Sequence, residues 1–353
     1  MVPENSKRKW LVPDQVPVGP PPHPHQTNPK GLILAGDIGG TKTNLALFQV
    51  VDNHLITLKE HNYRTKDFDS FIAMARDFLT DMEKPDRTCL GVAGPVVQGR
   101  VHGTNFPWDL DTRELSHQLQ WSPIFLINDM EANAYGLSLL APSEFEPLQK
   151  GSGMAGNAVL MSPGTGLGEA GLYWDGTTYL PFATEGGHAD FSPRKGLDID
   201  LWHYLHKKYG HVSWERVLCG KGIHDLYEFL GTSGKFPESQ EVSARFSLED
   251  PAAVITREAM AGNDDLCRET LMLFIRYTAI EASQLALKFK AMGGVYLGGG
   301  IAPKILPAIQ RDTFHAHFLG SGRMDELLEN IPIKVILNER TALLGAARYA
   351  ATH

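Results

Sequence analysis

The residues most capable of chemistry lie in six short stretches, and the first of these, residues 36–43, reads GDIGGTKT. Glycines let backbone N–H groups approach an anion closely, while Thr41, Lys42 and Thr43 add two hydroxyls and a positive charge. Asp37 ends an apolar run, where its carboxylate could hold a magnesium ion through water. An ordinary hairpin turn needs fewer glycines, so the stretch predicts a phosphate-binding turn. The binding residues predicted here are Gly36, Asp37, Gly39, Gly40, Thr41 and Lys42.

Two further glycine-rich stretches follow predicted strands in the second half of the chain. Residues 163–168 read PGTGLG, and residues 297–303 read LGGGIAP. Either stretch alone is a weak signal, because tight turns commonly contain glycine. Together with the first stretch, PGTGLG indicates a phosphate chain held from two sides, and the later glycines would let a flat adenine ring lie against the backbone. The binding residues predicted here are Gly164, Thr165, Gly166, Gly299 and Gly300.

Asn128 and Asp129 directly follow the apolar run PIFLI at residues 123–127. Ligands of open α/β sheets bind outside the carboxyl ends of the strands, which is where these two side chains are expected. A helical pattern begins at Asp129, and the helix dipole favours a carboxylate at the N-terminus and lowers its pKa. The local sequence leaves a second interpretation open, in which Asp129 only caps the helix.

Two carboxylates and a histidine follow in the second half of the chain. Glu185 and His188 flank two glycines in the stretch EGGH, and Glu215 opens the stretch ERVLCGKG. Carboxylates accept hydroxyl protons of a sugar ring, and an imidazole can donate or accept. Zinc binding is the rival interpretation for His188, but no cysteine or histidine follows at a suitable spacing. From the local sequence alone, Glu215 could equally be a surface charge.

A pattern of strand, glycine turn and strand occurs twice and positions these stretches. Residues 31–37 and 44–51 flank the first turn, and residues 157–162 and 169–174 flank the second. Neither turn runs directly into a helix, which distinguishes both from a dinucleotide-binding fingerprint, and the GxxxxGK[ST] phosphate loop is missing too. The other predicted strands are 54–63, 88–93, 123–128, 177–181, 294–298 and 332–337. The predicted helices are 68–79, 129–140, 198–209, 251–261, 264–291 and 339–350, and one more starts at Asp111.

Length and composition indicate a globular protein and exclude several classes of function. The 353 residues suggest two domains, and a content of 42% hydrophobic and 21% charged residues is ordinary for a globular fold. A formal net charge of -8 argues against nucleic-acid binding. Three widely spaced cysteines form neither a disulfide framework nor a zinc ribbon, which fits a cytoplasmic location. The sequence has no apolar run that predicts a membrane span and no signal-peptide core.

Residues 1–30 are predicted to form a tail outside the folded domains. Their most biased stretch, residues 19–25, reads GPPPHPH, which favours extended polyproline geometry and cannot pack a core by itself. A solvated, flexible linker is the expected state, and metal binding by His23 and His25 is the alternative.

The order and spacing of the six stretches resemble those of the bacterial-type glucokinases, relatives of hexokinases, actin and the heat-shock ATPases. The similarity runs from about residue 31 to the end of the chain. It implies an α/β fold of two ribonuclease H-like domains, the actin-like ATPase fold, flanking an active-site cleft. The small domain would comprise residues 31–138 plus 339–353, and the large domain residues 139–338. The C-terminal helix would then pack on the first domain.

The resemblance also implies the activity, the ligands and their contacts. The protein would transfer the γ-phosphoryl group of ATP, with Mg2+, to the 6-hydroxyl of glucose, with Asp129 as the general base. GDIGGT and GTGLG would hold the phosphates, and the late glycines would approach the adenosine. A homodimer is the family expectation. The implied glucose-binding residues are Asn105, which lies in the stretch GTNFPW, and Asn128, Asp129, Glu185, His188 and Glu215.

One difference from related sugar kinases excludes some family members, but several activities stay open. Some related sugar kinases and repressors carry a cysteine-rich zinc motif after the histidine, whereas residues 189–193 here read ADFSP. This argues against a zinc-dependent member and against a sugar-responsive repressor, and no residue is predicted to ligate a metal directly. The acceptor could be another hexose, such as mannose, fructose or an N-acetylated sugar, and the donor could be ADP or polyphosphate. The sequence is also compatible with a non-catalytic sugar or nucleotide sensor and with an actin-like ATPase.

Overall fold

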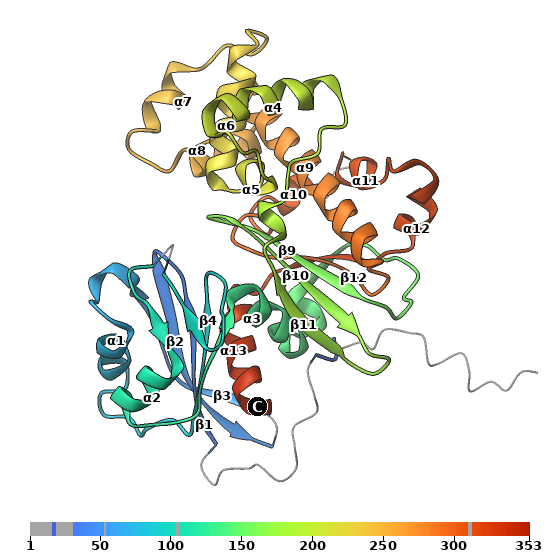
Figure 1. The fold of residues 1–353 in the computed structure, drawn as a ribbon. Coiled ribbons are helices and arrows are strands. Elements are labelled where there is room, and N and C mark those ends of the chain that lie inside the picture. Colours follow the sequence, from blue (N-terminus) through green and yellow to red (C-terminus); the bar gives the residue numbers. More distant parts are fainter. Residues whose placement is uncertain (1–15, 19–30, 53, 104–105, 310–312) are drawn as a thin grey trace, which may run out of the picture. The chain divides into compact units, whose positions relative to one another are not determined.

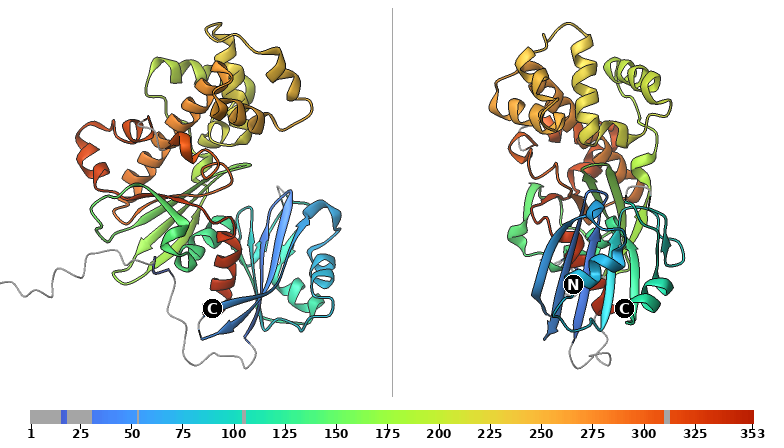
Figure 2. Two further views of the ribbon diagram at one scale, coloured as in Figure 1. Left: turned by 180° about the vertical axis from the view of Figure 1, so that it is seen from behind. Right: turned by 90° about the vertical axis from the view of Figure 1, so that its left-hand side faces the viewer.

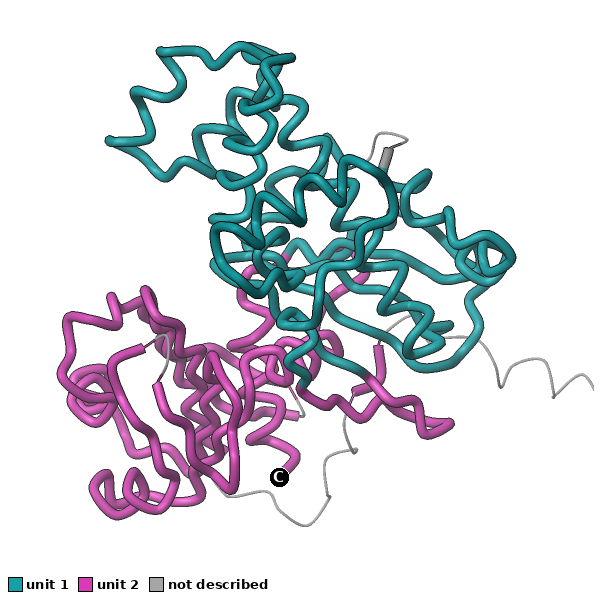
Figure 3. The backbone as a smooth tube through the Cα atoms, turned by 45° about the horizontal axis from the view of Figure 1, so that its top comes forward, with its two compact units in different colours: residues 1–12, 145–171, 184–337 teal, residues 13–144, 172–183, 338–353 magenta. Residues whose placement is uncertain are grey.

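A computed structural model of the chain describes residues 16–18, 31–52, 54–103, 106–309 and 313–353. The described chain is an α/β protein with two compact units (Figure 3). The first unit along the described chain, magenta and labelled unit 2 in Figure 3, comprises the described residues within 13–144, 172–183 and 338–353. The second, teal and labelled unit 1, comprises the described residues within 145–171 and 184–337. The predicted division differs in residues 139–144, 172–183 and 338, which belong to the first unit. Within this unit Glu144 accepts a hydrogen bond from Asn338 (2.5 Å).

The sheet of the first unit has five strands in the order β3-β2-β1-β4-β7 (Figure 1). Their bounds are β1 (Leu32–Ile38), β2 (Lys42–Val51), β3 (His54–Arg64), β4 (Arg87–Val92) and β7 (Ile124–Asn128). β1 pairs antiparallel with β2 and parallel with β4, which pairs parallel with β7. In this register Ile38 lies opposite Val92, and Val92 lies opposite Asn128. The three parallel strands therefore end at one edge of the sheet.

Helices cover both faces of this sheet (Figures 1 and 2). α1 (Phe71–Phe78) and α2 (Thr112–Leu119) lie on one face, and α3 (Asp129–Gly136) and α13 (Thr341–Thr352) on the other. The core under α1 and α2 is apolar because alternate residues of β1 and β2, among them Leu34, Ile38 and Leu45, point towards these helices. Two short strands, β5 (Arg100–Val101) and β6 (Leu110–Asp111), form a separate ribbon.

The last helix, α13, packs against α3 and against β1 and β4. Two glycines allow this contact. A Cβ on Gly345 would lie 1.7 Å from the carbonyl oxygen of Ala132, and a Cβ on Gly136 would lie 2.0 Å from that of Thr341. The two helix backbones therefore touch, and the C-terminal segment belongs to the unit built by the first half of the chain.

The second sheet has six strands in the order β11-β10-β9-β12-β13-β8. Their bounds are β8 (Phe145–Gln149), β9 (Ala158–Pro163), β10 (Leu167–Trp174), β11 (Tyr179–Thr184), β12 (Gly294–Leu297) and β13 (Ile333–Ile336). β12 is parallel to both β9 and β13, and β8 is antiparallel to β13. The carboxyl ends of β9 and β12 consequently point in the same direction.

The long helix α9 is the centre of the helical layer of the second unit (Figure 1). It packs against α6, α8 and α11 and against β9, and most of its residues are buried. The helices are α4 (Gly196–Tyr209), α5 (Trp214–Val217), α6 (Gly220–Thr232), α7 (Gln240–Arg245), α8 (Pro251–Ala261), α9 (Asp265–Phe289), α10 (Leu306–Ile309), α11 (Thr313–Phe318) and α12 (Asp325–Glu329). Within the residues that the structure describes, no helix combines the length and apolarity needed to cross a bilayer.

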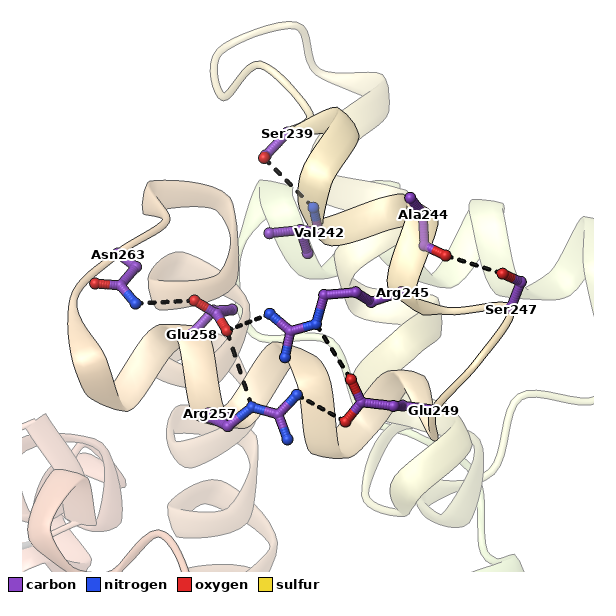
Figure 4. Close-up of polar contacts among 9 residues, drawn as sticks. All are labelled: Ser239, Val242, Ala244, Arg245, Ser247, Glu249, Arg257, Glu258 and Asn263. Carbon is purple, nitrogen blue, oxygen red and sulfur yellow. Dashed lines mark hydrogen bonds and ion pairs between the residues drawn. The ribbon is translucent and has the colours of Figure 1, made fainter.

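α7 and α8 are joined by a network of ion pairs (Figure 4). Arg245 donates to Glu249 (3.2 Å) and Glu258 (2.6 Å), and Arg257 donates to Glu249 (2.8 Å). Glu258 also accepts a hydrogen bond from Asn263 (2.9 Å). These bonds link α7 to α8 alongside the apolar contacts of Val242.

Residues 16–18, which lie inside the predicted tail, pair with the start of β11. Val18 forms a parallel bridge with Tyr179, whose N–H donates to the carbonyl oxygen of Pro17 (2.7 Å). The Thr178 hydroxyl donates to the same oxygen (2.9 Å). Val16 and Val18 are 3% and 2% exposed, so this short segment is packed rather than solvated. The other residues of the predicted tail lie outside the described part of the chain.

Most predicted elements occur, with shifted ends. The helix expected from Phe68 begins at Phe71, because the Ser70 hydroxyl accepts from the Ala73 N–H (3.2 Å) and caps it. The strand expected at 177–181 is β11, which begins at Tyr179 and ends at Thr184. The prediction did not contain β5, β6, β8, α5, α7, α11 or α12, which are short and carry little periodicity.

Candidate active site

The predicted phosphate-binding turn connects β1 to β2 in the first unit. The Gly39 N–H donates to the Lys42 carbonyl oxygen (2.9 Å), which closes the turn, and Thr41 and Lys42 are exposed at its tip. Thr43, by contrast, is fully buried and its hydroxyl lies 3.0 Å from that of Thr65. The expectation that Thr43 offers a hydroxyl to a phosphate is therefore wrong, because its buried hydroxyl contacts Thr65, which holds the turn at Gly39.

Thr65 holds this turn in place and was missed in the sequence. Its hydroxyl donates to the Gly39 carbonyl oxygen (2.8 Å), and its N–H donates to the Thr41 carbonyl oxygen (3.1 Å). Thr65 begins a short 3-10 helix after β3 and is fully buried. No local signal marks it, since the contact joins residues that are 26 positions apart.

Gly36 and Gly39 lie so close to neighbouring atoms that a side chain would not fit freely, but neither has a left-handed backbone. A Cβ on Gly36 would lie 2.7 Å from Leu90 Cδ2, and a Cβ on Gly39 would lie 3.1 Å from the Lys42 carbonyl oxygen. Neither residue has a positive φ, whereas Gly299 does (φ 76°). A left-handed backbone that favours glycine therefore occurs at Gly299 in the late glycine stretch and not at Gly36 or Gly39.

Asp37 and Asp129 lie at the same edge of the first sheet, because β1 and β7 both end there. Asp37 is half-buried, and its carboxylate accepts a hydrogen bond from Asn44 (3.4 Å). Burial raises the pKa of Asp37, and the Asn44 hydrogen bond opposes the rise. A Cβ on Gly91, in the strand between them, would lie 3.9 Å from Asp129 Cα. The same Cβ would lie 2.8 Å from Ala132 Cβ, so a glycine at this position lets helix α3, which begins with Asp129, pack closely on β4.

Asn128, and not Asp129, caps helix α3. The Asn128 Oδ1 accepts from the N–H groups of Met130 (2.8 Å) and Glu131 (3.4 Å), and its Nδ2 donates to the Gly94 carbonyl oxygen (3.1 Å). Asp129 is the first residue of the helix and is half-buried, and its Oδ1 also accepts from Met130 N–H (2.9 Å). The interpretation that Asp129 only caps the helix is therefore wrong, because Asn128 is the cap. Asp129 lies at the edge of the sheet.

In the second unit, the turn between β9 and β10 is joined directly to Glu215. The Leu167 N–H donates to Glu215 Oε2 (3.0 Å), and a Cβ on Gly166 would lie 2.5 Å from the same oxygen. Gly166 is therefore required to make room for Glu215, which is half-buried at the start of α5. Glu215 is not merely a surface charge, the alternative that the local sequence had left open.

The late glycine stretch lies beside this turn. The Gly298 N–H donates to the Met161 carbonyl oxygen (2.8 Å), and the Ile301 N–H donates to that of Pro163 (3.3 Å). A Cβ on Gly299 would lie 2.4 Å from the Pro163 carbonyl oxygen. The two glycine stretches predicted to hold ATP in this half of the chain are thus adjacent.

The turn that carries Glu185 and His188 packs against Leu167, the first residue of β10. The Glu185 carbonyl oxygen accepts from the His188 N–H (3.0 Å), which forms a single 3-10 turn. Their side chains are 56% and 60% exposed, and Glu185 Oε2 lies 4.0 Å from His188 Nε2. A Cβ on Gly187 would lie 2.1 Å from the Leu167 carbonyl oxygen, so the turn rests on β10.

The second unit therefore brings three predicted sugar-binding residues to one strand. Leu167 binds Glu215 through its N–H and faces Gly187, the residue between Glu185 and His188, through its carbonyl oxygen. A second link, from the Trp214 N–H to the Ala189 carbonyl oxygen (3.0 Å), joins the two segments. Asn105 lies outside the described residues. Among the described residues, no group of three histidine, cysteine or acidic side chains is arranged to hold a metal ion.

Comparison with known proteins identifies the family. A family model described as Glucokinase matches residues 34–353. The chain belongs to the glucokinase family. The glucokinase of Nostoc punctiforme is 40% identical over 337 residues, which cover 91% of this chain and 99% of that protein.

Solved structures agree with this assignment. The glucokinase from an Antarctic psychrotroph is 30% identical, with a TM-score of 0.78, and the match covers 92% of this chain and 99% of that one. A ROK family glucokinase from Streptomyces griseus, in complex with glucose and AMPPNP, is 20% identical with a TM-score of 0.63 over 92% of this chain and 100% of that one, and shows the same fold. The predicted family and the actin-like ATPase fold are confirmed.

Proposed function

We propose that this glucokinase uses Asp129 as the general base in the transfer of the γ-phosphoryl group from ATP to the 6-hydroxyl of glucose. Membership of the family over residues 34–353 makes the chain an ATP-dependent glucokinase. The observation that supports Asp129 is its position: it begins α3 at the edge where β1 and β7 end, next to the turn predicted to hold phosphate. Substrates of open α/β sheets bind at such an edge.

The proposed step is an in-line displacement at phosphorus. The Asp129 carboxylate accepts the proton of the glucose 6-hydroxyl while that oxygen forms a bond to the γ-phosphorus. The bond between the γ-phosphorus and the bridging oxygen breaks, and ADP leaves with the bonding electrons. Little covalent chemistry falls to the protein, so positioning of the acceptor oxygen dominates the rate.

The two glycine turns are proposed to bind the phosphates through backbone N–H groups. The exposed tip residues Thr41 and Lys42 would add a hydroxyl and a positive charge. Asp37 fits a magnesium ion bound through water, because its half-buried carboxylate lies beside this tip and its Asn44 hydrogen bond leaves acceptor capacity. Magnesium, when bound with ATP, neutralises charge that develops on the β- and γ-phosphates.

Glu185, His188, Glu215 and Asn128 are proposed to bind the sugar hydroxyls, together with Asn105. The geometry that supports this set is the common support of Glu185, His188 and Glu215 by Leu167. A glucokinase from Balamuthia mandrillaris and the Streptomyces griseus enzyme have been solved in complex with glucose, and the latter also with AMPPNP. We extend these ligands, glucose and ATP, to the present chain.

The substrate assignment is tested by measuring ADP release from Mg-ATP with glucose, mannose, fructose, N-acetylglucosamine and no sugar. We expect strong release with glucose and a low blank. Release with another hexose in place of glucose would contradict the proposed acceptor. Release that is independent of sugar would indicate an ATPase, and binding of glucose without release would indicate a sensor or another phosphoryl donor.

The cellular setting and the assembly are also proposals. Cys89, Cys219 and Cys267 are free and buried in the structure, which fits the cytoplasm. A homodimer is expected from the family, and sedimentation of the purified protein at micromolar concentration would test it.

A further inference from the structure

Two buried carboxyl groups below the sugar-binding turn have no role in the proposed reaction. Glu169 on β10 is 2% exposed and Glu281 on α9 is 0% exposed. None of their four carboxyl oxygens has a hydrogen-bond partner among the described residues. Burying an unpaired carboxylate is costly, so such a pair is expected to stay in its neutral form unless something compensates the charge.

Compensation of the charge is only partial. Lys288 Nζ lies 3.9 Å from Glu281 Oε1, but the lysine side chain is 52% exposed, so solvent weakens the attraction. Burial raises the pKa of Glu169 to about 7, and Lys288 opposes the rise. Burial, followed by the nearby charge of Glu169, raises the pKa of Glu281 to about 9, and Lys288 and Arg194 oppose the rise. Below about pH 7 the pair is therefore mainly uncharged, and Glu169 is the first of the two to ionise as the pH rises.

The Glu169 carboxyl group touches the turn that carries Glu185 and His188. A Cβ on Gly186 would lie 2.0 Å from Glu169 Oε2. The backbone of Glu169 is tied to the same turn, because its carbonyl oxygen accepts from the Thr184 hydroxyl (2.9 Å), which in turn accepts from the Gly186 N–H (3.2 Å). A movement of this carboxyl group would therefore displace Gly186, which lies between Glu185 and His188.

We propose that Glu169 and Glu281 are positioning residues, whose uncharged carboxyl pair holds the turn at Gly186 so that Glu185 and His188 can bind the sugar. Neither residue is proposed to touch the substrate. The inference rests on the proposed roles of Glu185 and His188. Ionisation of Glu169 places a negative charge in a buried site under the turn, and the turn must then shift to admit solvent.

The direction of the pH effect follows from the raised pKa values. The folded state keeps protons that the unfolded state, with an ordinary carboxyl pKa near 4.5, has already lost. Stability therefore falls as the pH rises from about 4.5 towards the folded pKa values and levels off above them. If the protonated form of Glu169 is the competent one, its fraction at pH 8 is roughly one in eleven, and glucose binding weakens about tenfold relative to pH 6.

The test compares the wild type with Glu169→Gln, which keeps the shape and stays neutral at every pH. The glucose Kd, measured by calorimetry without ATP, is expected to rise about tenfold between pH 6 and pH 8 in the wild type and less than about twofold in the variant. The two proteins should agree within about twofold at pH 6, and kcat at saturating glucose should be similar. The other ionisable groups are common to both proteins, so their effects cancel in the comparison.

Three control measurements keep the result interpretable. Glu281→Gln should bind glucose within about twofold of the wild type at pH 6, because it also preserves a neutral pair. Glu258→Gln removes a carboxylate from the α7–α8 network (Figure 4) and should leave the pH dependence of the glucose Kd unchanged. The melting temperature of Glu169→Gln should exceed that of the wild type by more at pH 8 than at pH 5.

Two results would overturn the proposal. One is a parallel pH dependence of the glucose Kd in the wild type and in Glu169→Gln. The other is a large loss of glucose binding at pH 6 in a folded Glu169→Gln protein. Failure of the sugar site itself would look different, because Glu185→Gln would then keep the wild-type glucose Kd at every pH.

Discussion

At the scale of single residues, Gly166 is a predicted ATP-binding residue that also makes room for Glu215, a proposed sugar ligand. Its missing side chain gives room to the Glu215 carboxylate, which the next residue, Leu167, holds through its N–H. One turn thus positions both the backbone proposed to bind phosphate and the carboxylate proposed to bind the sugar. Phosphoryl transfer depends on bringing donor and acceptor together, so this coupling serves the proposed reaction.

Replacing Gly166 by alanine should therefore affect the sugar as well as ATP. The new Cβ would lie 2.5 Å from Glu215 Oε2 and would displace it. We expect the KM for glucose to rise by about tenfold or more, because Glu215 would lose its place against the substrate. Gly196→Ala is the matched control, since a Cβ there meets nothing within 4 Å. A glucose KM that is unchanged in Gly166→Ala would contradict the role of Glu215.

The functional role of a residue could be predicted from the sequence where the neighbouring residues form a recognisable pattern. Asp129 and the pair Glu185 and His188 stood out because polar side chains interrupt apolar or glycine-rich runs. Thr65, Glu169 and Glu281 did not, because their roles depend on contacts between segments far apart in the chain. The local pattern also misplaced Thr43, whose hydroxyl is turned away from the tip by the backbone of β2.

At the scale of elements, the contact between α3 and α13 controls the start of the helix that carries Asp129. The helices approach so closely that only glycine fits at two positions, Gly136 and Gly345. Backbone contact of this kind cannot relax by turning a side chain. The orientation of α3, and with it of Asp129, therefore depends on the last helix of the chain.

Gly345→Ala should push these helices apart. The added Cβ would lie 1.7 Å from the Ala132 carbonyl oxygen. We expect the free energy of unfolding to fall by about 1–3 kcal/mol, the usual cost of overpacking, and kcat to fall because Asp129 moves. The control is Gly231→Ala in α6, where the nearest atom is 3.8 Å from the new Cβ and alanine favours the helix. Equal stability of the two variants in urea would argue against the close contact.

Long periodic elements could be predicted from sequence, and short irregular ones could not. α9 and α8 were expected within two residues of their ends, because each has a polar N-cap and a long apolar pattern. The four-residue helices α5 and α10 have no such pattern and owe their form to packing. Glu215 was consequently predicted as a sugar ligand, but the helix that carries it, α5, was not predicted.

At the scale of the whole molecule, the N-terminal segment contributes to the fold although its composition suggested a solvated tail. Val16 and Val18 are buried, and Pro17 accepts two hydrogen bonds from the start of β11. The segment covers part of an edge strand, which would otherwise present unpaired backbone groups. Composition alone could not predict this, because the contact is specific to three residues within a proline-rich stretch.

Deletion of residues 1–18 should therefore destabilise the protein. Loss of two buried valines, each worth about 1.5–3 kcal/mol, should lower the melting temperature by several degrees, and the exposed edge should promote self-association. Calorimetry and size-exclusion chromatography would measure the two effects. A deletion of residues 1–12 keeps Val16–Val18 and serves as the control. If both deletions melted at the wild-type temperature, the segment would have no structural role.

Asp129 is central to the proposed mechanism, and the turnover of Asp129→Asn tests its role most directly. The variant should fold and bind glucose like the wild type, because asparagine has the same shape and Asn128 still caps α3. Its kcat for ADP release with Mg-ATP and saturating glucose should fall on the order of 10²–10⁴-fold, the usual contribution of a positioned general base. A folded Asp129→Asn protein with near wild-type kcat would contradict the proposed mechanism.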